Sequence, residues 1–286
     1  MIEVISGGLY TSIQDLGRFG YRRLGVPLSG AMDSYSARLA NRLVGNSIND
    51  AVLEITHIGP VLYFTHKTEI SITGAGFCPT LNNLEVPLNS RVFIPEGSTL
   101  KFGLPGYGLR AYLSVHGGFN NEKKLNSYSQ YLGITTKETL EKGDKLLIKE
   151  YNAQPSKLTA SVKVPKEHFT SENIQVYQGP EFHLFSEVIQ KKLLEIPLVV
   201  GADSNRMAYM IDGMSKFSAN EIITAPVQPG TVQLMPSGQC VVLMRDAHTT
   251  GGYARILQLS ESAINVLAQK RAGEKIKFRF IDVEKE

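Results

Sequence analysis

The sequence predicts a mainly β protein with a few helices, built as two related domains. Three observations lead to this prediction: short segments rich in β-forming residues recur along the chain, a similar phrase stands near both ends, and the chain has 286 residues. A chain of roughly this size lies where a single hydrophobic core stops growing, so one large or two medium domains are expected. The apolar fraction of 42% is ample for such cores.

The repeated phrase combines an acidic residue, a short polar or glycine-rich loop, a Gly-Tyr pair and an arginine just beyond. The first copy runs from Asp15 to Arg22, and the second runs from Asp246 to Arg255. A strand or helix that serves only burial does not need these residue types in this order. The two copies therefore predict two domains related by duplication, each supplying a similar loop.

Most of the predicted elements are strands. The segments concerned are rich in β-branched and aromatic residues and are bounded by Gly, Pro or Asn. They recur about every ten to fifteen residues, which is the spacing of a sandwich or a barrel. The clearest predicted strands cover residues 61–64, 69–73, 91–94, 109–115, 231–234 and 240–244.

Three segments predict helices. Residues 34–44 place small and aliphatic side chains on one side, and either Ser29 or Asp33 is expected to cap the start of this helix. Residues 262–269 predict a short helix. In the third, residues 182–194, one face is predicted to carry apolar side chains: Phe185, Val188, Ile189 and Leu193.

The stretch from residue 151 to 172 is predicted to link the two domains. It is polar, contains Pro155 and Pro165, and has weak hydrophobic periodicity. This places an N-terminal domain at residues 1–155 and a C-terminal domain at residues 156–286.

Composition excludes several classes of function. The net charge of +3 comes from 30 basic and 27 acidic residues without a basic stripe, so no nucleic-acid partner is expected. Cys78 and Cys240 have no metal-ligand spacing and are expected to be free thiols. No apolar stretch approaches the roughly 18 residues of a membrane span, and the N-terminus lacks the features of a signal peptide. We therefore expect a cytoplasmic protein with no membrane partner and no metal site of its own.

Longer motifs resemble those of a known family. The chain is similar to the KipA family, whose members are also called 5-oxoprolinase C subunits or allophanate hydrolase subunit 2, and which also carries the label biotin-dependent carboxyltransferase. Family members are similar to two cyclophilin-like β-barrel domains, so the resemblance implies this fold. The motifs occur in the family's order and cover nearly the whole chain: residues 11–21, 24–33, 40–46, 53–55, 73–75 and 249–253.

The resemblance implies one subunit of an ATP-dependent 5-oxoprolinase, which opens the lactam 5-oxo-L-proline to L-glutamate. The implied partners are a KipI-like protein and a LamB/YcsF-like protein, with ATP and Mg²⁺ as cofactors of the complex. Two alternatives stay open: a regulatory KipA-type protein that antagonises a KipI-like kinase inhibitor, and half of a biotin-dependent carboxyltransferase acting on urea or a similar amide. Biotin is a cofactor only in the last of these, and the chain has no Met-Lys biotinylation signal. The isolated chain is expected to hydrolyse neither ATP nor 5-oxoproline.

Three acidic residues are candidates for catalysis. Asp15 and Asp246 could position a nucleophile, bind a substrate N–H or hold Mg²⁺; alternatively, they cap turns by accepting backbone hydrogen bonds. Glu54 lies in an apolar segment, which favours a raised pKa suited to proton transfer, unless it forms a salt bridge with Arg42.

Anionic substrate or phosphate groups require arginines and exposed backbone N–H groups in glycine-rich loops. Carboxyl transfer requires similar donors, so the residue types do not separate the two chemistries. The tyrosines of the phrases are also expected to pack against neighbours. The candidate binding residues are Gln14, Arg18, Asn41, Arg42, Arg206, Thr249, Thr250, Gly251, Gly252 and Tyr253.

The sequence departs from the family's pattern at two places. Asn126, Tyr128 and Gln130 stand where the family usually has Gly, Arg and Thr, and Asn205 stands where an aspartate is usual. These changes remove an arginine and a carboxylate from predicted site loops, which favours the regulatory alternative, whereas the fold should be unaffected.

The repeated phrases finally predict a composite site. If the two barrels pack with pseudo-twofold symmetry, the loop from Asp15 to Arg18 and the loop from Asp246 to Tyr253 would face one groove. Such a groove suits a small anionic ligand and its metal. The alternative is that each loop only closes its own barrel.

Overall fold

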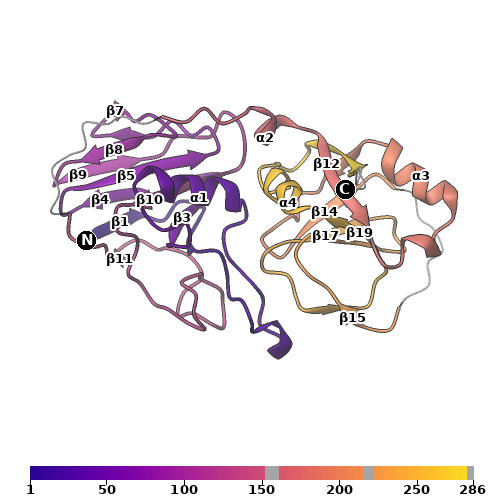
Figure 1. Ribbon diagram of the computed structural model, residues 1–286. Coiled ribbons are helices and arrows are strands. Elements are labelled where there is room, and N and C mark those ends of the chain that lie inside the picture. The colour runs from indigo at the N-terminus through magenta and orange to yellow at the C-terminus, as the bar shows by residue number, and fades with distance from the viewer. Residues whose placement is uncertain (152–160, 215–221, 282–286) are drawn as a thin grey trace. The chain divides into compact units, whose positions relative to one another are not determined.

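The computed structural model describes residues 1–151, 161–214 and 222–281. The chain divides into two compact units (Figure 1). The first comprises Met1–Arg18 and Ser29–Phe169, and the second comprises Phe19–Leu28 and Thr170–Glu286. The predicted boundary at residues 155 and 156 lies outside the described residues. Residues 19–28 belong to the second unit although the sequence places them within the N-terminal half.

The described part of the predicted linker is divided between the units: residues up to Phe169 belong to the first unit, and residues from Thr170 belong to the second. It contains the short helix α2 (Glu167–Thr170). His168 Nε2 lies 2.7 Å from Asp33 Oδ2, and the ring of Phe169 packs against Tyr107 with 5.0 Å between ring centroids. These contacts explain why the first unit extends to Phe169.

The first unit contains two antiparallel sheets. One has the strand order β11-β1-β4-β9-β6-β7 and the other the order β2-β3-β10-β5-β8. The strands are β1 (Ile2–Ser6), β2 (Tyr10–Gln14), β3 (Val52–Thr56), β4 (Val61–Phe64), β5 (Thr68–Gly74), β6 (Thr80–Leu81), β7 (Leu84–Glu85), β8 (Arg91–Ile94), β9 (Ser98–Lys101), β10 (Arg110–Val115) and β11 (Lys145–Leu146).

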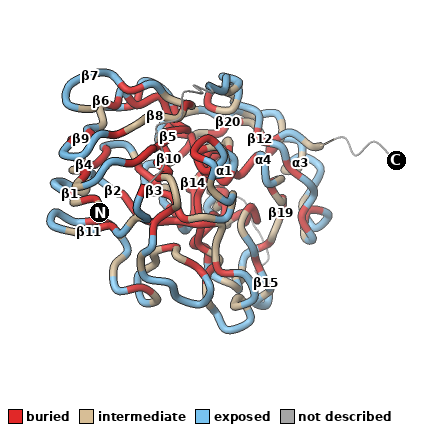
Figure 2. The backbone as a smooth tube through the Cα atoms, turned by 60° about the vertical axis from the view of Figure 1, so that its left-hand side comes forward, coloured by how far each residue is buried: buried red, intermediate tan, exposed pale blue. Residues whose placement is uncertain are grey.

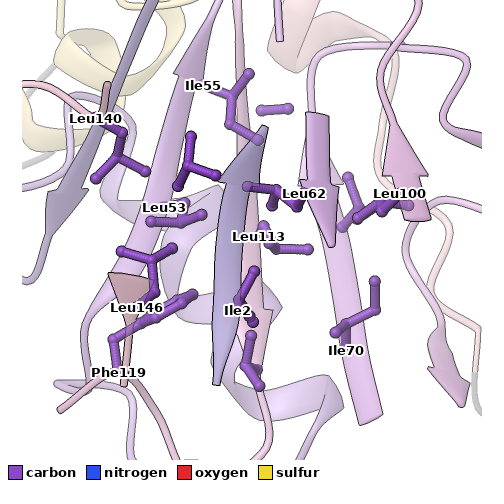
Figure 3. Close-up of a cluster of buried hydrophobic side chains, with 14 of the residues drawn as sticks. Ile2, Leu53, Ile55, Leu62, Ile70, Leu100, Leu113, Phe119, Leu140 and Leu146 are labelled. Carbon is purple, nitrogen blue, oxygen red and sulfur yellow. The ribbon is translucent and has the colours of Figure 1, made fainter. Parts of the chain in front are cut away.

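The main core of the first unit combines apolar side chains from both sheets. Ile2 and Leu62 come from the six-stranded sheet, whereas Leu53, Ile70 and Leu113 come from the five-stranded sheet, and all five are buried (Figure 3). Alternate residues of a strand face opposite sides of a sheet, so each strand supplies every second side chain to this core.

Helix α1 (Ser34–Leu43) covers the other face of the five-stranded sheet. It packs on β3, β5 and β10. β5 and β10 are therefore covered on both faces and are buried at every position. Of the two predicted caps, Asp33 is the one observed, because its Oδ1 accepts a hydrogen bond of 3.1 Å from the Ser36 N–H.

The second unit contains a closed barrel of seven strands in the order β12-β19-β16-β17-β14-β13-β20. Its core includes Ile174, Val232, Val242 and Phe278, each fully buried. The strands of this unit are β12 (Asn173–Gln178), β13 (Leu198–Val200), β14 (Ala208–Asp212), β15 (Ala225–Pro226), β16 (Thr231–Leu234), β17 (Cys240–Leu243), β18 (Thr250–Gly251), β19 (Arg255–Leu259) and β20 (Lys275–Phe280), of which β15 and β18 form a separate pair.

Two helical segments of the second unit modify the sequence prediction. The predicted helix 182–194 is divided into a 3₁₀ turn, η2 (Phe182–Leu184), and α3 (Glu187–Glu195), because Phe185 adopts an extended conformation. Val188 and Leu193 both lie in α3, five residues and therefore about 140° apart around the helix, so Leu193 is buried whereas Val188 is 64% exposed. The predicted apolar face is wrong at Val188. Helix α4 (Glu261–Leu267) lies close to the predicted 262–269 and is capped by Ser260.

The prediction of a mainly β fold with a few helices is confirmed. Buried residues follow the strands of each unit, whereas exposed residues gather in the connecting loops (Figure 2). In the part of the chain that the structure describes, no helix is long and apolar enough to cross a membrane. Both cysteines are free thiols, Cys78 exposed and Cys240 buried.

Candidate functional site

The Asp15 carboxylate holds together a loop of the first unit. It accepts hydrogen bonds from the Gly17 N–H at 2.8 Å, from the Ser127 hydroxyl at 2.7 Å, from the Tyr128 N–H at 2.7 Å and from the Ser129 hydroxyl at 2.6 Å. The residue is only 8% exposed. Of the alternatives that the sequence left open for Asp15, this geometry matches the acceptor of backbone hydrogen bonds.

Arg18 and Gln14 bind the same segment. The fully buried Arg18 donates from Nη2 to the Ser129 carbonyl, and Gln14 donates from Nε2 to the Gln130 carbonyl at 3.2 Å. Gln130 in turn accepts from the Ile13 N–H at 2.9 Å through its side-chain oxygen. The segment that departs from the family's pattern is therefore fixed along the end of β2.

Tyr128 and Gln130 also line a pocket of about 310 Å³ in the first unit. Tyr128 is partly buried, and Lys123 Nζ lies 5.4 Å from the centre of its ring. The pocket is lined by two acidic and two basic residues, Glu122, Asp144, Lys137 and Lys145, so its described wall has no excess of one charge. Two of the substituted positions thus change the wall of a pocket.

Glu54 lies in a buried polar network beneath helix α1. Its Oε2 accepts from the Met32 N–H at 2.7 Å and from the Tyr112 hydroxyl at 2.9 Å. Its Oε1 lies 3.7 Å from Nε of Arg110. The sequence suggested a salt bridge with Arg42, and the structure places Arg110 in that role instead. Burial and the nearby Glu54 charge raise the pKa of the Tyr112 hydroxyl well above its usual value.

Asn41 and Arg42 are neighbours in sequence with different environments. Asn41 is buried; its Nδ2 donates to the Asp50 carbonyl at 2.7 Å, and its Oδ1 accepts from the Ser114 hydroxyl at 2.6 Å. Arg42 is exposed in the last turn of α1. Neither residue lines the pocket beside Tyr128 and Gln130.

In the second unit, Asp246 and Arg206 form a buried ion pair. Arg206 donates from Nε to Oδ2 at 2.7 Å and from Nη2 to Oδ1 at 3.1 Å, and Arg206 and Asp246 are 6% and 8% exposed. Asn205, where the family usually has an aspartate, accepts from the N–H groups of Met207 and Ala208 at 2.8 and 3.2 Å. An aspartate oxygen would accept the same bonds, so the substitution preserves the turn.

A cationic pocket of about 620 Å³ lies within the second unit. Its described lining contains three arginines and several hydroxyl and amide groups but no acidic residue. Thr249 and Thr250, two of the predicted binding residues, are part of it. The lining residues are Arg22, Arg23, Gly25, Pro180, Pro226, Val227, Gln228, Thr231, Thr249, Thr250, Arg255, Leu257 and Gln258.

Two of these arginines are the ones that end the repeated phrases. Arg22 donates from Nη2 to the Val227 carbonyl, and Arg255 donates from Nη1 to the neighbouring Pro226 carbonyl at 2.9 Å. Both guanidinium groups therefore hold the segment that begins at β15. Neither arginine was among the binding residues predicted from the sequence. Their common position after a Gly-Tyr pair was the signal that could have found them.

Local structure sets the direction of Arg22 and Arg23. They begin a 3₁₀ turn, η1 (Arg22–Leu24), which Gly25 ends in the left-handed region with a φ of 80°. This conformation favours glycine, which has no Cβ to clash with the backbone. Burial lowers the pKa of the Arg22 guanidinium from its usual value.

Arg255 is neutralised within the wall of the pocket. It donates to Glu181 from Nη2 at 2.7 Å and from Nε at 2.9 Å, and the Arg255 N–H donates to the same carboxylate at 2.9 Å. These bonds lower the pKa of the Glu181 carboxyl. The excess positive charge of the pocket therefore comes from Arg22 and Arg23, which form no ion pair with any residue that the structure describes.

The Glu181 pair gives the protein a pH-dependent stability. Because the folded-state pKa of Glu181 is lower than its ordinary value of 4.5, its contribution is complete above that value and is lost as the pH falls through the folded-state pKa. We expect Glu181→Gln to reduce the free energy of unfolding at pH 7 and to reduce it progressively less below about pH 4.5. Urea unfolding across this range measures the effect. The exposed Glu195→Gln is the control, and an equal loss for Glu181→Gln at all pH values would contradict the prediction.

The remaining glycines and tyrosine of the second phrase shape the loop around the pocket. Gly251 pairs with Ala225 in the β15–β18 ladder, and Gly252 accepts from the Ile222 N–H at 3.2 Å. The carbonyl of Tyr253 accepts from Gln233 Nε2 at 3.1 Å. None of the three lines the pocket. The Asp15–Arg18 loop belongs to the first unit and the Asp246–Tyr253 loop to the second, so the predicted shared groove stays a prediction.

The structure defines the class of this protein. It is a mainly β protein of two units, and one of these units is a closed barrel with a cationic pocket. The profile of the family described as "Carboxyltransferase domain, subdomain A and B" matches residues 24–280. The chain belongs to this family.

Curated relatives span nearly the whole chain. It is 34% identical to the C subunit of 5-oxoprolinase from Escherichia coli (strain K12) over 97% of this chain and 90% of the relative. It is 31% identical to the same subunit from Haemophilus influenzae over 99% of this chain and 92% of the relative. Urea amidolyase of Saccharomyces cerevisiae is 47% identical over 46% of this chain, which corresponds to 7% of that protein.

Solved structures share the fold. A crystal structure of TTHA0988 matches with a TM-score of 0.87 and 31% identity, covering 97% of this chain and 55% of that chain. Kluyveromyces lactis urea carboxylase matches with a TM-score of 0.87 and 30% identity, covering 97% of this chain and 27% of that chain. This chain therefore spans about half of the TTHA0988 chain and about a quarter of the urea carboxylase.

Proposed function

We propose that this chain is the C subunit of an ATP-dependent 5-oxoprolinase that opens 5-oxo-L-proline to L-glutamate. The observation that carries the proposal is the similarity to two curated 5-oxoprolinase C subunits over at least 97% of this chain and 90% of each relative. A cationic pocket lined by hydroxyl and amide groups supports it, because the substrate combines a carboxylate with a lactam.

A C subunit implies partner subunits. We propose that these partners are a KipI-like protein and a LamB/YcsF-like protein. Under this proposal ATP and Mg²⁺ act in the assembled complex. Among the residues that the structure describes, no group of three His, Cys, Asp or Glu side chains is arranged to hold a metal ion. The described lining of the cationic pocket also has no acidic residue. It therefore fits an anion better than a bound Mg²⁺, and we assign the ligands of Mg²⁺ to ATP and the partner subunits.

Reconstitution tests this function. We expect the chain to co-elute with KipI-like and LamB/YcsF-like proteins of the same genome in size-exclusion chromatography. The assembly should convert 5-oxoproline to glutamate only when ATP is present, whereas the chain alone should hydrolyse neither ATP nor 5-oxoproline. Turnover by the isolated chain, or an inactive three-protein complex, would contradict the proposal.

A second candidate is carboxyl transfer from carboxybiotin. The family profile and the 47% identity to part of a urea amidolyase favour it. Avidin, which sequesters biotin, separates the two functions: it should abolish a biotin-dependent reaction and leave ATP-dependent opening of 5-oxoproline unchanged. The regulatory alternative rested on the arginine lost at Tyr128 and the carboxylate lost at Asn205. Asn205 still accepts the hydrogen bonds of its turn, so the change at Tyr128 is the one that favours this alternative.

A further inference from the structure

We infer that Arg22 and Arg23 bind the carboxylate of a small lactam acid in the pocket of the second unit. This inference rests on the proposed function for the identity of the substrate. It goes beyond that function by assigning the recognition of the substrate to two residues of the segment 19–28, neither of which was a candidate from the sequence.

Charge is unevenly distributed in the lining of this pocket. Three arginines and no acidic residue line the described wall of the pocket. Arg255 is engaged in two side-chain hydrogen bonds with Glu181, so its charge is balanced within the wall. Arg22 and Arg23 have no such partner in the described parts of the chain. A negatively charged group of a ligand would balance the charges of Arg22 and Arg23.

Arg22 also has a buried hydrogen-bond donor that is unsatisfied among the described residues. Arg22 is anchored through Nη2 to the Val227 carbonyl, whereas its Nη1 is buried without a hydrogen-bond partner among the described residues. A buried donor without a partner costs free energy, and the cost is larger for a charged group. A carboxylate oxygen at Nη1 would remove this cost, and the anchor to Val227 fixes the guanidinium plane before the ligand arrives.

Two threonines of the pocket suit the lactam part of the ligand. Thr249 and Thr250 line the same pocket, and their side-chain hydroxyls form no hydrogen bond within residues 1–151, 161–214 and 222–281. A hydroxyl both donates and accepts, which suits the carbonyl and the N–H of a lactam. The volume of about 620 Å³ lies within the usual range of small-molecule sites.

The lining favours a carboxylate over the phosphate groups of a nucleotide. Phosphate sites of that kind are usually built from successive backbone N–H groups of glycine-rich loops, together with a metal ion. Among the described residues of this lining, Gly25 is the only glycine, and no acidic residue is available to hold a metal. A planar guanidinium group matches the oxygens of a carboxylate or of a phosphate, so the preference for a carboxylate rests on the absence of such a loop and of acidic metal ligands from the described lining.

Calorimetric titration of the full chain tests the inference with three probes: 5-oxo-L-proline, 2-pyrrolidinone, which is the same lactam without the carboxylate, and inorganic phosphate. We expect 5-oxo-L-proline to bind, and 2-pyrrolidinone to bind at least about tenfold more weakly because the charged hydrogen bonds are lost. Arg22→Ala and Arg23→Ala should each weaken the binding of 5-oxo-L-proline by about tenfold or more. The exposed Arg38→Ala, in the other unit, is the matched control and should leave it unchanged.

Several outcomes would overturn the inference: no binding of 5-oxo-L-proline by the folded chain, equal binding of 2-pyrrolidinone, equal effects of Arg38→Ala and Arg23→Ala, or phosphate as the only probe that binds. Arg23 is exposed, so its variant remains informative if Arg22→Ala impairs folding through the lost bond to Val227. Because binding is measured on the chain alone, an inactive reconstituted complex with Arg23-dependent binding would reject the proposed function and retain this site.

Discussion

Replacing Asp246 by alanine is expected to destabilise the protein by about 3–5 kcal/mol. The variant leaves the buried Arg206 guanidinium without the carboxylate that accepts two of its hydrogen bonds, at 2.7 and 3.1 Å. Removing one partner of a buried ion pair is among the more costly changes in a folded protein, because the remaining charge loses the carboxylate that balanced its desolvation. Urea unfolding at neutral pH, followed by circular dichroism, measures the loss.

The control for this variant is Asp203→Ala. Asp203 is exposed a few residues from Arg206, and it accepts a hydrogen bond from Asn205 through its backbone carbonyl, which the substitution keeps. We expect a change within about 0.5 kcal/mol for this control. The double variant Arg206→Met with Asp246→Leu should recover much of the stability, since both charges are then absent. A stable Asp246→Ala variant with impaired activity in the complex would show instead that Asp246 acts in the reaction.

The strands of this protein were largely predictable from the sequence. Val61–Phe64, Arg91–Ile94 and Thr231–Leu234 have the predicted bounds, and helix α1 ends one residue earlier than expected. These segments carry their own pattern, because each buries alternate or periodic side chains in a core. The sheet pairing was not predictable in this way, since it depends on contacts between residues far apart in the chain.

The candidate site was less predictable, for a physical reason. Asp15, Asp246 and Glu54 were selected because acids in loops and apolar strands are unusual, and unusual acids serve either chemistry or structure. All three accept several hydrogen bonds or ion-pair contacts within their own unit. The composition of the sequence cannot distinguish a catalytic acid from a structural one. The number of hydrogen-bond donors around the carboxylate in the structure does distinguish them.

Arg22 and Arg23 line the pocket but were not predicted as binding residues from the sequence. Arg22 and Arg23 stand in an exposed stretch of sequence without any periodicity, and their importance arises because residues 19–28 belong to the second unit. When a segment packs in a different unit from the residues that flank it in the chain, its own sequence has no pattern that predicts this packing. Only the shared position of Arg22 and Arg255 after the repeated Gly-Tyr pair linked them before the structure was known.

Asp15→Ala is expected to destabilise the first unit by about 3 kcal/mol, because hydrogen bonds to a charged acceptor are each worth roughly 1.5–3 kcal/mol and are not additive. The variant removes one acceptor from four donors at once and releases the segment from Ser127 to Ser129 from the end of β2. Asp15→Asn should lie between the alanine variant and the natural protein, since its amide oxygen still accepts some of these bonds.

Hydrogen exchange provides the specific measurement for Asp15. The Tyr128 N–H donates directly to the carboxylate, so its protection should fall strongly in Asp15→Ala. Glu138→Ala, which replaces an exposed acid of the same unit, should change neither the unfolding free energy nor this protection. If Asp15→Ala instead keeps its stability and the protection of Tyr128 but abolishes activity of the reconstituted complex, the carboxylate serves the reaction. The hydrogen bonds of the resting structure would then be exchanged for substrate contacts during turnover.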